Sequence, residues 1–127
     1  DMPLLERVAR GDTLPFEVIS AELTPDKMPQ WLAGVLAALA SRPENHGEAE
    51  PRVNILATAT GSGLVRMAVI PRRAHRPDFY GTDEGEWLVS PASVDLAGTV
   101  ILPREADFRS FSPDTLRALL AQTTYLL

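Results

Sequence analysis

The fold is decided by a segment near the middle of the chain that has the pattern of two strands around a tight turn. The segment reads Val53-Asn54-Ile55-Leu56-Ala57-Thr58-Ala59-Thr60-Gly61-Ser62-Gly63-Leu64-Val65-Arg66-Met67-Ala68-Val69-Ile70. Apolar and β-branched residues dominate both runs, and the Thr-Gly-Ser-Gly tetrapeptide between them supplies glycine for the positive φ of a turn. This pattern predicts an antiparallel hairpin with strands at 53–59 and 64–70.

The residues before this hairpin predict a strand followed by an amphipathic helix. Residues 4–10 favour a short helical turn, and residues 14–23 favour a half-buried strand. Thr24 followed by Pro25 is a good helix start, with threonine as the N-cap and proline at the first helical position. The helix is expected to end near Ser41. Its apolar face consists of Met28, Trp31, Leu32, Val35, Leu36 and Leu39.

The residues after the hairpin predict further sheet and a closing helix. Short strands are expected at 86–90 and 98–102, separated by a compact connection at 91–97. Ser112 precedes Pro113 and an apolar run, which predicts an N-capped helix. The expected fold class is therefore α+β, with an antiparallel sheet of about four or five strands and two main helices packed on it.

The composition is that of one globular domain. The chain has 127 residues, of which 45% are hydrophobic, and this is enough to bury a core. The polar stretch at 42–51 is expected to be a surface loop, because too little chain precedes it to fold alone. We therefore expect a single domain over residues 1–127. The sequence begins at Asp1 without an initiator methionine, which favours a fragment of a longer protein.

Charge and residue usage argue against several classes of function. The net charge of −5 argues against a nucleic-acid partner. The absence of cysteine excludes disulfides, thiolate zinc sites and cysteine nucleophiles. Apolar runs are shorter than the roughly 20 residues of a membrane span, and the first residues lack the pattern of a signal peptide. We therefore expect a cytoplasmic protein without a membrane partner.

Against this acidic background, residues 71–80 form a basic loop bracketed by prolines. Its cationic side chains are Arg72, Arg73, His75 and Arg76. Guanidinium groups bind oxyanions through two parallel hydrogen bonds, so the loop predicts a site for a small phosphate or carboxylate. The alternative is a surface loop whose arginines pair with acids elsewhere, such as Asp83 or Glu84.

The residue types needed for catalysis are present only in patterns that are not diagnostic. His46 and His75 lie too far apart for an alternating histidine motif, and two histidines cannot form a three-histidine metal site. Ser90 and Ser93 occur near Asp95, but such triads are defined by geometry and not by this spacing. Asp95 also fits a turn or cap. We expect no catalytic residue, metal or cofactor within this chain.

Several blocks of the sequence resemble a known family. They are Val53-Asn54-Ile55-Leu56, Arg66-Met67-Ala68-Val69-Ile70-Pro71-Arg72, His75-Arg76-Pro77, Ser90-Pro91-Ala92-Ser93-Val94-Asp95-Leu96-Ala97-Gly98 and Leu102-Pro103-Arg104-Glu105-Ala106-Asp107-Phe108. They resemble the C-terminal half of uncharacterised bacterial proteins related to GDP-L-galactose phosphorylase and ATP adenylyltransferase, in the histidine-triad-like superfamily. The resemblance covers mainly residues 51–125, and residues 14–41 fit it loosely.

The resemblance implies a histidine-triad-like half-domain without its own nucleophile. In such proteins the catalytic histidine lies in an alternating His-x-His-x-(His/Gln) motif of the N-terminal half and attacks the α-phosphorus of a nucleotide. This chain lacks that motif, because His75 stands in Ala-His-Arg. The resemblance therefore implies ligand binding only. The residues expected to hold phosphate are Arg72, Arg73, His75 and Arg76, with Ser93 and Asp95 as second-tier candidates.

Two functions from different classes remain open at this point. The first is the accessory half of a nucleotidyltransferase or phosphorylase, which binds a nucleotide or sugar-phosphate ligand. The second is a non-catalytic structural or dimerisation module that packs against the N-terminal half of the same protein or against a second copy. The apolar stretch at 125–127 favours the second, because three large side chains in a row need a cover.

Overall fold

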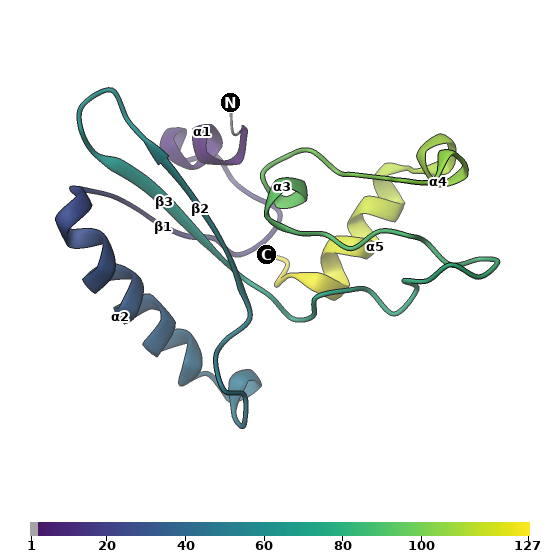
Figure 1. The fold of residues 1–127 in the computed structure, drawn as a ribbon, viewed down its shortest axis with the longest axis horizontal. Helices are drawn as coiled ribbons and strands as arrows, with labels where there is room; N and C mark the ends of the chain where they lie inside the picture. The colour runs from purple at the N-terminus through teal and green to yellow at the C-terminus, as the bar shows by residue number, and fades with distance from the viewer. Residues whose placement is uncertain (1–2) are drawn as a thin grey trace.

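The computed structural model describes residues 3–127 and has the α+β architecture expected from the sequence. A three-stranded antiparallel sheet has the order β1-β3-β2. The elements are α1 (Pro3–Arg10), β1 (Ile19–Leu23), α2 (Met28–Ala40), β2 (Val53–Ala59), β3 (Val65–Pro71), α3 (Ser93–Leu96), α4 (Glu105–Ser110) and α5 (Pro113–Thr123), with 3₁₀ turns at Pro25–Lys27 and Pro43–Asn45. Figure 1 shows α2 on the opposite side of the sheet from α3 and α5.

The predicted hairpin is confirmed as β2 and β3. Its register pairs Val53 with Pro71 and Ala59 with Val65. Gly63 has a φ of +78° in the connecting turn, which is the left-handed conformation that glycine adopts without strain. β1 pairs with the other side of β3, from Ile19 opposite Val69 to Leu23 opposite Val65. The hairpin therefore supplies two of the three strands, and its second strand is the centre of the sheet.

The expectation of four or five strands is wrong, because the segments at 86–90 and 98–102 do not join the sheet. Leu88 donates its backbone N–H to the carboxylate of Asp107, at 3.1 Å. Ile101 donates its backbone N–H to the carboxylate of Asp95, at 2.9 Å. An amide bonded to a side chain is not available to a strand ladder, so these apolar segments are held as loops.

The two faces of the sheet bury different sets of side chains. Side chains alternate along each strand, so Leu56, Ala68 and Ile70 share one face. This face joins α1, α3 and the segment before β1 in the main core, which consists of Leu4, Leu5, Leu14, Phe16, Leu56, Ala68, Ile70 and Leu96. Met67 and Val69 lie on the other face, where they are buried on the side of α2.

Helix α2 covers its face of the sheet incompletely. Leu39 is buried, whereas Trp31 and Leu32 are only half-buried. The predicted start is also corrected, because Pro25 opens a 3₁₀ turn and the α-helix begins at Met28. The hydroxyl of Thr24 makes no capping hydrogen bond within residues 3–127. The helix ends at Ala40, in agreement with the expected end near Ser41.

The C-terminal helix follows the sequence prediction closely. The hydroxyl of Ser112 accepts a hydrogen bond from the backbone N–H of Thr115, at 3.1 Å, and Pro113 occupies the first turn. This cap satisfies a donor that the first helical turn otherwise leaves free. The residues after the helix return to the core side of the molecule, where Phe16 bridges Leu126. The chain after β3 is thereby anchored to the segment before β1.

The buried face of β3 provides a test of the fold. We expect Ile70→Ala to lower the free energy of unfolding by about 2 to 5 kcal/mol, because Ile70 is fully buried and the shortened side chain leaves a cavity. Chemical denaturation followed by circular dichroism measures this change. Ile101→Ala is the matched control, since Ile101 is 56% exposed. Equal losses in the two variants would contradict the proposed core.

Candidate functional site

Arg72 is a buried structural residue at the start of the basic loop. Its side chain makes five hydrogen bonds, the number of N–H groups on a guanidinium. The Nε donates to the carbonyl of Thr123 at 2.8 Å, and one terminal nitrogen donates to the side-chain oxygen of Asn54 and the carbonyl of Pro91. The other donates to the carbonyls of Ala74 and His75 at 3.0 and 3.3 Å. The guanidinium therefore has no donor left for a phosphate.

Burial and a nearby carboxylate act in opposite directions on the pKa of Arg72. Burial lowers the pKa of its guanidinium, because removal from water disfavours the cation, and the negative charge of Asp95 opposes this effect in part. Within residues 3–127, no carboxylate forms an ion pair with Arg72, Arg73 or Arg76. The expected alternative, pairing of the loop arginines with Asp83 or Glu84, is therefore not what holds this loop.

The other two arginines of the loop are exposed and lie against aromatic rings. The guanidinium carbon of Arg76 lies 4.3 Å from the ring centre of Tyr80, and its Nε donates to the hydroxyl of Ser90 at 3.3 Å. The guanidinium carbon of Arg73 lies 5.9 Å from the ring centre of Tyr125. Cation–π contact at exposed sites is weak, so both arginines keep most of their hydrogen-bonding capacity. They point to different neighbours and do not form one cluster with His75.

His75 lies on a groove between α2 and the first residues of β2. The groove has a volume of about 650 Å³. Its apolar wall comes from α2 and β2, and its polar residues lie before β2 and in the basic loop. The lining residues are Leu36, Ala37, Ala40, Glu48, Ala49, Glu50, Pro51, Arg52, Val53, Ile55 and His75. Of the four cationic residues of the basic loop, His75 lines this groove.

A second cationic residue of the groove is Arg52, which the sequence pattern did not single out. Arg52 lines the same groove, and its terminal nitrogen pairs with the carboxylate of Glu48 at 2.5 Å. The backbone explains the juxtaposition, because the N–H of Arg72 donates to the carbonyl of Arg52 and extends the hairpin by one pair. The signal in the sequence was positional. The residue before one strand of a hairpin faces the residue after the other strand.

Ser93 and Asp95, the second-tier candidates, have internal partners. The side-chain amide of Asn54 donates to the hydroxyl of Ser93 at 3.0 Å. One carboxylate oxygen of Asp95 accepts the N–H of Ala92 at 2.8 Å, and the other accepts the N–H of Ile101 at 2.9 Å. Asp95 therefore caps the short helix α3 and fixes the loop after it, in line with its expected alternative as a turn or cap residue.

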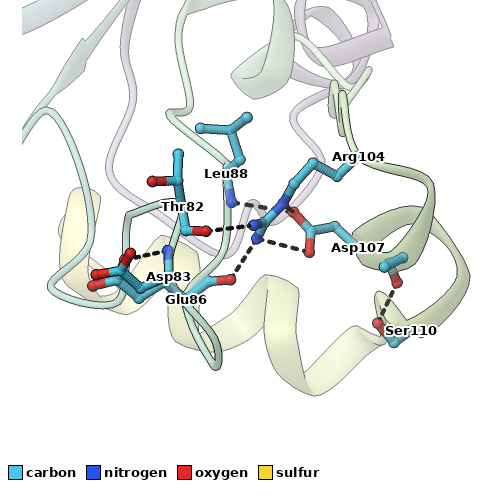
Figure 2. A network of polar contacts seen from close by, with 8 residues as sticks. Thr82, Asp83, Glu86, Leu88, Arg104, Asp107 and Ser110 are labelled. Atoms are coloured by element: carbon cyan, nitrogen blue, oxygen red, sulfur yellow. Dashed lines mark hydrogen bonds and ion pairs between the residues drawn. The ribbon is translucent and has the colours of Figure 1, made fainter.

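A second polar network, around Arg104 and Asp107, includes none of the residues that line the groove (Figure 2). Arg104 binds Asp107 through two nitrogens at 2.9 and 3.1 Å and also donates to the carbonyl of Glu86 at 2.5 Å. Asp107 is buried, and the hydrogen bond from Arg104 is the main cause of its lowered pKa. Figure 2 shows the acidic turn around Asp83 and Glu86 bonded within itself. This network organises the loop at 82–88.

Comparison with protein-family models, with curated proteins and with solved structures finds no match. Within residues 3–127 no helix has both the length and the apolar content needed to cross a membrane. In the same part of the chain, no three side chains of the metal-binding types lie together.

The structural role of Arg72 can be separated from a role of its charge. We expect Arg72→Lys to lower the free energy of unfolding by about 2 to 4 kcal/mol, because an ammonium group cannot reach the five acceptors and leaves buried carbonyls unpaired. Arg73→Lys is the matched control on the exposed neighbour. Chemical denaturation of both variants checks this, and equal midpoints would show that Arg72 is not a structural anchor.

The Arg104–Asp107 pair predicts a specific acid sensitivity. The pKa of Asp107 is lower in the folded protein than in the unfolded chain, so its carboxylate stabilises the fold at pH values above its unfolded pKa of about 3.9. This stability is lost as pH falls through the folded pKa. We expect the stability difference between the wild type and Asp107→Asn to shrink as pH falls from 6 to 2. Thermal unfolding across this range measures it.

The matched control for this experiment is Asp78→Asn, which changes an exposed carboxylate of the basic loop. This variant removes one exposed carboxylate of the same type, so the comparison isolates what the contact with Arg104 adds at Asp107. If Asp107→Asn behaves like Asp78→Asn, then Arg104 does not hold Asp107 in its ionised form.

Proposed function

We propose that this domain is the accessory half of a nucleotidyltransferase- or phosphorylase-like protein with a histidine-triad-like fold, and that it holds the phosphate groups of a nucleotide or sugar nucleotide. The single observation that carries this proposal is the groove that His75 and Arg52 share above an apolar wall. A nucleotide has an apolar, flat part and a charged part, and small-molecule sites commonly combine an apolar lining with a few polar groups. The groove has this combination.

The proposed site assigns different tasks to the cationic residues. Arg52 and His75 contact the phosphate directly, because both line the groove. Arg73 and Arg76 are exposed on the same loop and raise the local positive potential, which attracts an anion to a chain that is negative overall. Arg72 holds the loop and does not contact the ligand, since its donors are used internally. The nucleophile is supplied from outside this chain.

Glu48 competes with the ligand in this arrangement. Its carboxylate pairs with Arg52 at 2.5 Å, and both side chains are about one-third exposed or more. A phosphate that binds Arg52 must displace Glu48, so the pair sets the affinity of the groove for anions. Exposed ion pairs of this kind are weak, which makes displacement feasible at modest cost.

Titration calorimetry with ADP, GDP and inorganic phosphate tests the proposal. We expect Arg52→Ala to weaken nucleotide binding by about tenfold or more, because it removes a charge-assisted hydrogen bond. His75→Ala should weaken it by a smaller factor. Glu48→Gln should strengthen binding, since it frees Arg52 without removing a cation. Each change also shifts the net charge in the direction of its expected effect, so a charge-matched change outside the groove is needed to separate direct contact from a general change of charge.

The matched control is Arg109→Ala. Arg109 pairs with Glu105 at 2.5 Å with the same four-residue spacing on an exposed surface, so the change removes the same charge and the same kind of pair. Binding should be unaffected by it. Equal effects of Arg52→Ala and Arg109→Ala, or no binding by the wild type, would overturn the proposed ligand site.

A second candidate function is a non-catalytic module that packs against another protein segment. The observation that favours it is an apolar hollow of about 350 Å³ beside α5, lined by Pro15, Pro113, Leu116, Arg117, Leu120, Leu126 and Leu127. Leu126 and Leu127 are 43% and 83% exposed, which is unusual for adjacent leucines. Absence of nucleotide binding in the calorimetric experiment would favour this candidate over the first.

A further inference from the structure

The outer edge of β2 is an open hydrogen-bonding surface. The N–H of Arg72 donates to the carbonyl of Arg52, which fixes the alternation along the hairpin. Asn54, Leu56 and Thr58 therefore direct their backbone groups toward β3. The backbone groups of Val53, Ile55, Ala57 and Ala59 point to the other side. Within residues 3–127 no strand pairs with that side of β2.

This edge lacks the features that protect natural sheet edges. β2 has seven residues, none of them charged and none of them proline. Ile55 is 39% exposed, and Ala57 and Ala59 are exposed as well. The opposite edge of the sheet is different, because β1 carries Glu22, which pairs with Arg66 on the neighbouring strand. Charges and prolines are the usual means of preventing edge pairing, so the β2 edge is open to another strand.

We propose that the edge of β2 pairs with β2 of a second copy of this chain. The strand is complementary to itself in one antiparallel register. In that register Val53 faces Ala59 of the second copy and Ile55 faces its Ala57, so that a large side chain meets a small one at each position. On the other face Asn54 meets Thr58, and Leu56 meets its own counterpart. The side chains of β2 thus match, in size and polarity, those they face on the reversed strand of the second copy.

The register also satisfies the free backbone groups. The outward-pointing residues at 53, 55, 57 and 59 face one another as hydrogen-bonded pairs, and each such pair exchanges two bonds, giving about eight in total. Two three-stranded sheets would join into one continuous sheet around a twofold axis. Val53 and Ile55 belong both to this register and to the apolar wall of the groove, whereas Arg52 and His75 belong to the groove alone. The pairing can be tested without a ligand.

The electrostatics give the pairing a characteristic salt dependence. Each copy has a net charge of −5, whereas the paired strands carry no charge. The long-range repulsion between two acidic copies is screened by salt, and the contacts of the strands are not. The dimer should therefore become tighter as ionic strength rises. A dimer held by surface ion pairs would respond in the opposite direction.

Sedimentation velocity over a range of protein and salt concentrations tests the proposal. We expect a concentration-dependent dimer in the wild type that tightens with salt. Ala57→Pro should raise the dissociation constant by about tenfold or more, because it removes an outward N–H and places a ring at the edge. The internal ladder keeps its bonds, since the N–H of Ala57 does not point to β3. Ala57→Lys should have the same effect on dimerisation through charge repulsion.

Two further variants complete the experiment. Ala106→Lys adds the same charge on exposed α4 and should not weaken the dimer. The double variant Ile55→Cys/Ala57→Cys should form an intermolecular disulfide in a chain that has no other cysteine, whereas Ile55→Cys alone should cross-link poorly. A monomeric wild type, a dimer that survives both Ala57 variants with native circular dichroism, or equal cross-linking of the single and double cysteine variants would overturn the proposed pairing.

Discussion

The guanidinium of Arg72 is the interaction on which the arrangement of the C-terminal half depends. It leaves the end of the central strand and binds acceptors in four separate segments: β2, the basic loop, the loop before α3 and the end of α5. Two of these segments, the basic loop and the loop before α3, have no regular secondary structure to hold them in place. A single planar cation with five fixed donors replaces the ladder hydrogen bonds that they lack. Its burial is tolerated because every donor has a partner.

This constraint also explains how the basic loop divides its charges. The side chain of Arg72 points into the protein interior, whereas those of Arg73, His75 and Arg76 are exposed. The carbonyls of Ala74 and His75 accept hydrogen bonds from Arg72, and these bonds fix the backbone of the loop. The side chain of His75 then lines the groove beside Arg52, while Arg73 and Arg76 lie on tyrosine rings. A run of cations in sequence therefore becomes one anchor, one groove residue and two surface charges.

Sequence patterns predicted the elements that depend on neighbouring residues. The hairpin of β2 and β3, the cap at Ser112 and the end of α2 all rest on local spacing, and all three are confirmed. The apolar segments at 86–90 and 98–102 have the composition of strands but do not become strands. The first segment is decided by a residue distant in the chain, since the carboxylate that binds Leu88 belongs to Asp107. The second is held by Asp95, which lies closer in the chain but also serves as the cap of α3. The burial of Arg72 could likewise not be predicted, because nothing in the neighbouring sequence distinguishes a buried arginine from an exposed one. The shared groove of Arg52 and His75 depends on the hairpin register and on the path of the loop together.

The carboxylates of Asp95 and Asp107 hold these two segments as loops, and this also determines which edge of the sheet is exposed. Asp95 and Asp107 accept hydrogen bonds from the backbone N–H groups of Ile101 and Leu88. An N–H bonded in this way cannot also donate to a neighbouring strand. The segments that have the composition to extend the sheet are thus held in loops beside it. The sheet stops at three strands, and β2 keeps an edge without charge or proline. Because these segments are held as loops, no further strand pairs with β2 within the described residues. The outward backbone N–H and C=O groups of β2 must therefore bond to water or to a second strand.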